Sequence, residues 1–142
     1  VLVTGGTLRF SSMSLVGEIG ADALRTTRIN KGFLGARGLS LERGLMDLNP
    51  EEVRIKQEMA DACERVIGIL DGTKWHRSAL LSFVPASQVH SIVTDSSAPS
   101  EETAAWQAQG VRVHVADTDL PDRPHVRPRD LRRVPPTEDV DA

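Results

Sequence analysis

Small polar and charged residues stand directly after the apolar runs of this chain, and their types suit the binding of a small phosphorylated polyol. Glycines let backbone N–H groups approach a phosphate, a lysine supplies a positive charge, and carboxylates accept hydrogen bonds from sugar hydroxyls. In open α/β sheets, ligands bind outside the carboxyl ends of the strands, where these residues are expected. The candidate site residues are Gly5, Gly6, Thr7, Arg37, Asp71, Lys74 and Asp95.

Each of these groups also has a plain structural interpretation. A Gly-Gly pair after a strand is usually only a turn, and Asp71 followed by Gly72 is a common turn dipeptide. Lys74 could be a solvated loop lysine whose aliphatic stem packs on Trp75. The sequence favours Lys74 over the other candidates because it follows a buried-looking strand and has Trp75 and His76 beside it.

Apolar runs alternate with helical patterns along residues 1–117, which is typical of a parallel sheet crossed by helices. The runs cover residues 1–4, 32–36, 66–70, 91–94 and 111–116. Continuous apolar character at 66–70 and 91–94 predicts central strands covered on both faces, whereas alternation at 111–116 predicts an edge strand. Helices are predicted after Ser14 and over residues 100–109. We therefore expect an α/β fold with a mostly parallel sheet and helices on both faces.

The clearest predicted helix covers residues 50–64. Asn49 is a suitable N-cap, Pro50 suits the first helical position, and Glu52 stands three residues after the cap. Glu52 and Lys56 have the i,i+4 spacing of an ion pair on an exposed helix face.

The composition changes near residue 117. Residues 118–142 contain five of the eight prolines and few apolar side chains, which favours disorder. The arginines of this segment could contact nucleic acid or an acidic partner, although the acidic residues among them favour simple solvation. We expect one domain over residues 1–117 and a Pro/Arg/Asp-rich tail over 118–142 that is dispensable for folding.

The overall composition, with 39% hydrophobic and 26% charged residues, is that of an ordinary globular protein. A net charge of -3 gives no basic surface for nucleic-acid backbones, so we expect this chain alone not to hold DNA. The single cysteine, Cys63, cannot form an intramolecular disulfide and is expected to be buried and unreactive. With no long apolar span in view, the pattern is typical of a cytoplasmic protein without a membrane association.

Several short segments in order along residues 1–116 carry a more specific pattern. They read Val3-Thr4-Gly5-Gly6-Thr7, Ser14-Leu15-Val16-Gly17, Asn30-Lys31-Gly32-Phe33-Leu34-Gly35-Ala36, Gly44-Leu45 leading to Asn49, Asp71-Gly72-Thr73-Lys74-Trp75, Ile92-Val93-Thr94-Asp95 and Gly110-Val111. Together they resemble the C-terminal sensor domain of DeoR-type bacterial transcription regulators. Asn30 stands where the family usually has aspartate. Thr73 and Trp75 belong to a segment whose usual sequence in the family is Asp-Ser-Ser-Lys-Phe.

The resemblance implies a fold shared with ribose-5-phosphate isomerase and the sensing of a phosphorylated sugar or sugar acid. It also implies a DNA-binding helix-turn-helix and the first part of the sensor upstream of Val1, which lies inside an apolar run where a complete reading frame would begin with methionine. We therefore expect an N-terminally truncated part of a homo-oligomeric regulator of carbohydrate metabolism, in contact with DNA only through the missing part. Whether that regulator is a repressor or an activator stays open.

A sugar-phosphate isomerase-like enzyme is the alternative. Isomerisation needs a positioned carboxylate base, and the isomerases carry an acidic cluster after the strand that corresponds to residues 32–36. Here that turn has Arg37 and Gly38, and Glu42 lies further along, so binding is favoured over catalysis. The histidines show no ligand spacing and no Ser/His/Asp arrangement is evident, so we expect no metal, no cofactor and no catalytic residue.

Overall fold

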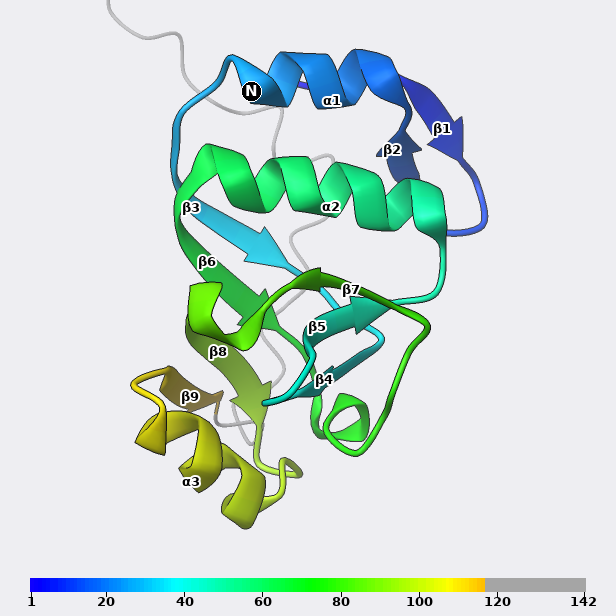
Figure 1. Ribbon diagram of the computed structural model, residues 1–142. Helices are drawn as coiled ribbons and strands as arrows, with labels where there is room; N and C mark the ends of the chain where they lie inside the picture. Colours follow the sequence, from blue (N-terminus) through cyan, green and yellow to red (C-terminus); the bar gives the residue numbers. More distant parts are fainter. Residues whose placement is uncertain (117–142) are drawn as a thin grey trace, which may run out of the picture.

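The computed structural model describes residues 1–116, whose strands form three sheets (Figure 1). The four-stranded sheet contains β3 (Ile29–Leu34), β6 (Cys63–Ile69), β8 (Val89–Asp95) and β9 (Arg112–Ala116) in that order. The three-stranded sheet contains β4 (Gly38–Ser40), β5 (Gly44–Asp47) and β7 (Leu81–Val84), and the hairpin contains β1 (Thr7–Arg9) and β2 (Ser14–Val16). The helices are α1 (Glu18–Arg25), α2 (Pro50–Ala62) and α3 (Ser100–Ala108), with 3-10 turns η1 (Gly72–Lys74) and η2 (Ala86–Gln88).

All neighbouring strands of the four-stranded sheet run parallel, which confirms the expected α/β fold with a mostly parallel sheet flanked by helices. β6 and β8 lie in the centre and β9 lies at an edge, as their apolar patterns predicted. The predicted strand at 66–70 begins earlier, at Cys63, so α2 ends at Ala62 rather than at residue 64. The N-cap of α2 is as expected, because the side chain of Asn49 accepts hydrogen bonds from the backbone N–H groups of Glu51 and Glu52.

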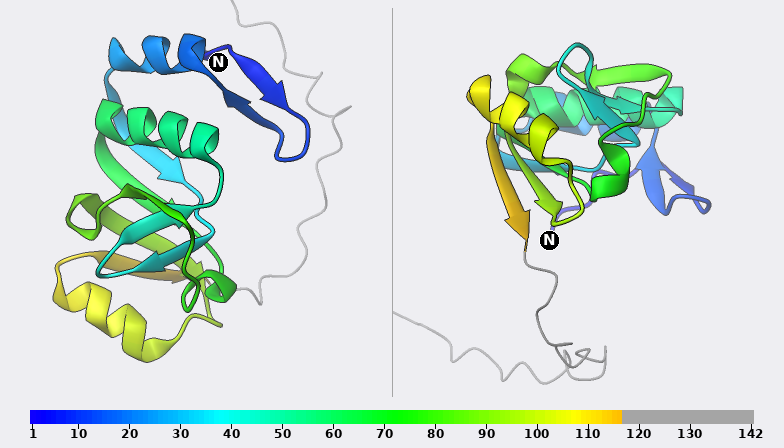
Figure 2. Two further views of the ribbon diagram at one scale, coloured as in Figure 1. Left: turned by 45° about the vertical axis from the view of Figure 1, so that its right-hand side comes forward. Right: turned by 90° about the horizontal axis from the view of Figure 1, so that it is seen from below.

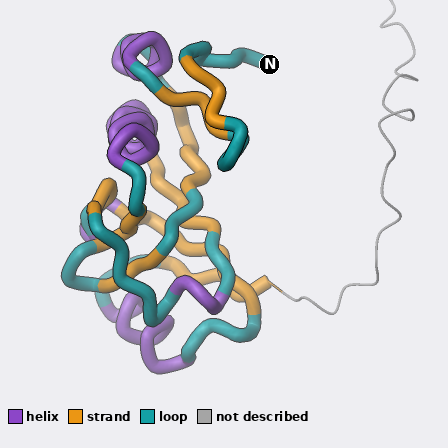
Figure 3. The backbone as a smooth tube through the Cα atoms, turned by 90° about the vertical axis from the view of Figure 1, so that its right-hand side faces the viewer, coloured by secondary structure: helices purple, strands orange, loops and turns teal. Residues whose placement is uncertain are grey.

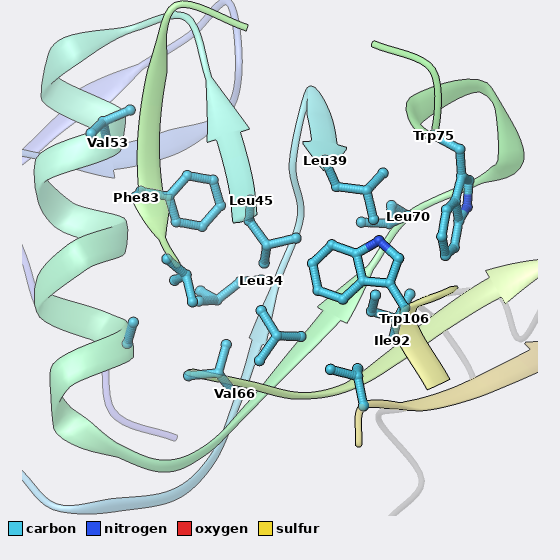
Figure 4. Close-up of a cluster of buried hydrophobic side chains, with 14 residues drawn as sticks. Leu34, Leu39, Leu45, Val53, Val66, Leu70, Trp75, Phe83, Ile92 and Trp106 are labelled. Carbon is cyan, nitrogen blue, oxygen red and sulfur yellow. The ribbon is translucent and has the colours of Figure 1, made fainter. Parts of the chain in front are cut away.

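One face of this sheet carries the main core (Figure 4). Figure 3 shows α2 and α3 on the same side of the strands. The strand order advances steadily from β3 to β9, and right-handed crossovers in a sheet of that order all fall on one face. Side chains that fill the space include Leu34, Leu45, Val66, Phe83, Ile92 and Trp106.

The opposite face differs from the sequence expectation within the described residues. Phe33 is 57% exposed and Ile69 is 48% exposed, and the neighbouring Ile67 is half-buried. These side chains make up the alternate positions of the strands whose other residues fill the core. The continuous apolar run at 66–70 thus corresponds to a central strand that the described helices cover on one side.

The N-terminal part also differs from the expectation. Residues 1–4 form no strand in the described structure, and the segment around Ser14 pairs with β1, so that the following helix begins only at Glu18. Helix α1 packs on α2 through a second core of Val16, Ala21, Leu24 and Ile55. No helix in residues 1–116 is long and apolar enough to cross a membrane. The expectation of a separate tail falls on residues 118–142, which lie outside the described residues.

Candidate functional site

The loops that follow β6 and β8 meet at the carboxyl edge of the parallel sheet. Asp71 follows β6 directly after Leu70, and Asp95 is the last residue of β8. The backbone N–H of Gly72 donates to the carboxylate of Asp95, with N to Oδ distances of 3.3 and 3.4 Å. Two of the predicted site segments are therefore joined by hydrogen bonds.

Lys74 lies in a small hydrogen-bonded cluster on η1. Its Nζ is 3.4 Å from Asp71 Oδ2 and donates to the hydroxyl of Thr73 at 3.2 Å. Asp71 caps η1 by accepting from the backbone N–H of Thr73 at 2.8 Å. The Thr73 hydroxyl, then the Thr73 backbone and the charge of Lys74, hold the pKa of Asp71 below its ordinary value. The structure thus brings an ionised carboxylate and an ammonium group together, with the lysine side chain 26% exposed.

Asp95 closes the second loop on itself as well as binding the first. Its Oδ1 accepts from the backbone N–H of Ser97 at 2.9 Å and also from the Ser97 hydroxyl. These contacts, with the N–H of Gly72, lower the pKa of Asp95. Oδ1 accepts from Gly72 and twice from Ser97, whereas Oδ2 has only the 3.4 Å contact from Gly72, so Oδ2 is better placed to accept from a ligand.

Gly72 lets the two loops approach more closely than any other residue would. A Cβ on Gly72 would lie 2.2 Å from Ser97 Oγ and 2.5 Å from the Ser97 carbonyl carbon. Contacts that short do not occur between real atoms, so a side chain at this position would force the loops apart. From the sequence, a glycine in this loop was expected to let the backbone approach a phosphate. In the structure, Gly72 instead lets the backbone approach the Ser97 loop.

Trp75 anchors the lysine loop to the sheet. Its side chain is fully buried in the main core (Figure 4). Its indole Nε1 donates to Thr94 Oγ1 at 3.0 Å. Thr94 immediately precedes Asp95, so the same hydrogen bond ties both site loops to the core.

A second charged cluster at this edge was missed by sequence reasoning. Lys56 Nζ is 2.5 Å from Asp47 Oδ2 and donates to the carbonyl of Gly35 at 2.8 Å, directly after β3. The side chain of Asp47 is 5% exposed and that of Lys56 is 21% exposed, and the ammonium lies 5.1 Å from the ring centroid of Phe83. A lone carboxylate at the end of the apolar segment Gly44–Asp47 was the available signal, since such a group needs a charged partner.

The i,i+4 pair that was predicted between Glu52 and Lys56 is wrong. Glu52 instead accepts from the hydroxyl of Ser12 at 2.6 Å and of Ser14 at 3.1 Å, and Arg9 Nε lies 3.7 Å away. The Ser12 and Ser14 hydroxyls, in that order, lower the pKa of Glu52. Residues from other elements therefore outcompete the helix neighbour.

Gly5 and Gly6 lie apart from these clusters. Both have positive φ, 78° and 103°, and a Cβ on Gly6 would be 2.5 Å from the carbonyl oxygen of Val16. They shape the chain where it enters the hairpin, which begins at Thr7 and lies at the far end of the molecule from β9 and α3 (Figure 2). The structure does not bring these residues together with Lys74.

Arg37 lies at the carboxyl edge of the sheet, and Thr4 shares a cavity with Lys56. Arg37 follows β3 at the same sheet edge, where its backbone N–H donates to the carbonyl of Met46 at 2.9 Å and its side chain is exposed. Thr4, just before Gly5, lines a cavity of about 630 Å³ together with Lys56. In residues 1–116 no group of three or more His, Cys, Asp or Glu side chains has the arrangement of a metal site.

Comparison with known proteins gives consistent matches. The family model described as the DeoR C terminal sensor domain matches residues 1–96. The chain is 31% identical over 113 residues to the putative aga operon transcriptional repressor of Escherichia coli O157:H7, which covers 80% of this chain and 42% of that protein. It is 29% identical over 113 residues to the HTH-type transcriptional regulator GlpR of Haloferax volcanii, covering 80% and 44%.

A third relative is the glycerol-3-phosphate regulon repressor of Escherichia coli K12, which is 27% identical over 99 residues, or 70% of this chain and 39% of that protein. The chain thus spans less than half the length of these relatives. All three carry names of transcriptional regulators.

Proposed function

Because this chain belongs to the family of DeoR C-terminal sensor domains, we propose that it binds a phosphorylated sugar or sugar acid at the carboxyl edge of its parallel sheet. The observation that carries the proposal is the cluster in which Lys74 is held beside Asp71 on a loop joined to Asp95. The name of one relative includes glycerol-3-phosphate, a phosphorylated polyol, which supports the same ligand class.

The roles of the individual residues follow from their chemistry. Lys74 supplies the positive charge to a phosphate or carboxylate, and Arg37, exposed after β3, supplies a second. Asp71 orients the lysine or accepts from a sugar hydroxyl, and Asp95 accepts through Oδ2, which otherwise has only the long contact from Gly72. Gly5, Gly6 and Thr7 lie apart from this cluster, so their proposed role is limited to shaping the chain next to Thr4, which shares a cavity with Lys56.

We propose further that residues 1–117 form the sensing unit of a cytoplasmic, homo-oligomeric regulator of carbohydrate metabolism. Contact with DNA belongs to a helix-turn-helix outside this chain, and residues 118–142 form a tail that folding does not need. Binding without turnover is the proposed activity, because the turn after β3 offers Arg37 and no acidic side chain, and the nearby carboxylate of Asp47 is engaged by Lys56.

The proposal is tested by calorimetric titration of the full-length regulator with a panel of sugar phosphates, combined with gel shifts on its own promoter region. A charge-assisted hydrogen bond to an anion contributes roughly 1.5–3 kcal/mol, so Lys74→Ala should weaken binding about ten- to a hundredfold while the fold is unchanged. Lys31→Ala is the matched control, because Lys31 is an exposed lysine of β3 away from the cluster. Unchanged affinity in Lys74→Ala removes this lysine from the site, and turnover of a sugar phosphate would favour the isomerase-like alternative.

A further inference from the structure

A second cavity, of about 380 Å³, lies between the turn after β4, the segment that follows Lys74, and α3. Arg43, Arg77, His76 and Glu102 are among its lining side chains, with Leu39, Met46 and Trp106 forming apolar parts of the wall. Neither Lys74, Asp71, Arg37 nor Asp95 lines it, so it is separate from the proposed sensing site. Its volume falls in the usual range for small-molecule sites.

Neither arginine of this cavity is paired with a carboxylate in the part of the chain that the structure describes. Among the described residues, no carboxylate lies within salt-bridge distance of the guanidinium of Arg43 or Arg77, whereas Glu102 is engaged by His76 Nδ1 at 2.6 Å. Glu42 is the other acid in the lining, and it also makes no ion pair with either arginine among residues 1–116. An anion from solution would give the two guanidinium groups the ion pair that they lack.

Arg43 is held in place before any ligand arrives. Its Nη1 donates to Ser78 Oγ at 3.1 Å and its Nη2 donates to the carbonyl of Leu80 at 3.0 Å. A guanidinium has five N–H donors, so donors remain for a ligand. Because the side chain is already ordered, little rotamer entropy is lost when it binds.

We propose that this cavity binds a small organic anion, with Arg43 and Arg77 contacting its carboxylate or phosphate and Leu41 and Ala105, in front of the buried Trp106, contacting its apolar part. The planar guanidinium matches both kinds of anion with paired hydrogen bonds. The apolar wall presents Leu41, which is 37% exposed, and therefore selects a ligand with a hydrocarbon or ring portion over inorganic phosphate.

The two tryptophans provide a binding reporter and a control within one sample. Trp106 lines the cavity, whereas Trp75 is hydrogen-bonded to Thr94 and does not line it. In ¹H–¹⁵N spectra of the 142-residue chain, titration with benzoate or phenyl phosphate should move the Nε1–H peak of Trp106 with saturation in the roughly millimolar range expected of such small probes. The Trp75 peak should stay in place, and neutral benzamide and inorganic phosphate should give no saturable shift.

Variants separate this cavity from the sensing site. Arg77→Ala should raise the Kd of the better probe about tenfold, which corresponds to the loss of one charged hydrogen bond. Arg112→Ala, an exposed arginine of β9, and Lys74→Ala should leave it unchanged. An equal response to benzamide, a common shift of both tryptophans, no saturable shift with either anionic probe, or an unchanged Kd in Arg77→Ala would each overturn the proposal. A stronger response to benzoate or to phenyl phosphate identifies which anion the arginines prefer.

Discussion

The indole N–H of Trp75 and the hydroxyl of Thr94 form a buried hydrogen bond of 3.0 Å between two side chains that each neighbour a site residue. Lys74 precedes the tryptophan and Asp95 follows the threonine. The placement of both site loops therefore depends on a contact inside the core.

Thr94→Val should destabilise the fold by about 1–3 kcal/mol, because it keeps the side-chain shape but leaves the indole N–H of Trp75 buried without an acceptor. Urea denaturation measures the change. In a double-mutant cycle with Trp75→Phe, the double variant should lose less free energy of unfolding than the sum of the losses in the two single variants. Strict additivity would show that the two side chains do not interact.

Lys56→Met should cost about 3 kcal/mol, because it leaves the carboxylate of Asp47 nearly buried and unpaired. This is the lower end of the free-energy cost of breaking a buried ion pair, because the lysine is partly exposed. Adding Asp47→Asn to Lys56→Met should recover part of the loss, measured by chemical denaturation. If Asp47→Asn lowers the free energy of unfolding further, the unpaired carboxylate of Asp47 is not the cause of the loss.

Gly72→Ala should destabilise the protein by about 1–3 kcal/mol through the clash of the new Cβ with Ser97. Gly35→Ala is the control, because a Cβ there would meet only the Ile69 carbonyl oxygen at an ordinary 3.8 Å. Thermal denaturation of both variants compares them directly. Equal melting temperatures would mean that the loops separate without cost.

Ser97→Ala should raise the pKa of Asp95, since the Ser97 hydroxyl is the main cause that lowers it. A carboxyl group whose pKa is lower in the folded protein stabilises the fold at pH values above its ordinary, unfolded-state pKa. This stability is lost as the pH falls through the folded-state pKa. The variant should therefore lose less stability on acidification than the parent protein. Carbon-detected NMR titration of the Asp95 carboxyl checks the shift, with Ser96→Ala as control, and an unchanged titration curve would contradict it.

The parallel sheet and α2 could be predicted because their signals are local. Asn49 and Pro50 mark the start of α2, and the apolar runs mark β6 and β8. The antiparallel sheet of β4, β5 and β7 could not be predicted in the same way, because its strands are short and β5 is buried at every position, so it shows no alternation. Its pairing depends on Gly44, whose φ of 70° lets the chain pass close to Val84.

The candidate site shows the same division. The sequence placed Asp71, Lys74 and Asp95 at strand ends, and parallel pairing does gather the three residues at one edge. Gly5 was placed there too, directly after a predicted strand at residues 1–4 that the structure replaces with the approach to a hairpin. The partner of Lys56 was missed because only helix neighbours were considered, whereas Asp47 comes from another element.

The close contact between Gly72 and the Ser97 loop has a consequence for binding energetics. The two loops are already fixed against each other and against the core, so their conformational freedom is given up during folding rather than when a ligand arrives. Affinity at this edge then depends on preorganisation as much as on direct contacts. A substitution that loosens the loops without touching the ligand would weaken binding through a less favourable entropy, with every hydrogen bond to the ligand still formed.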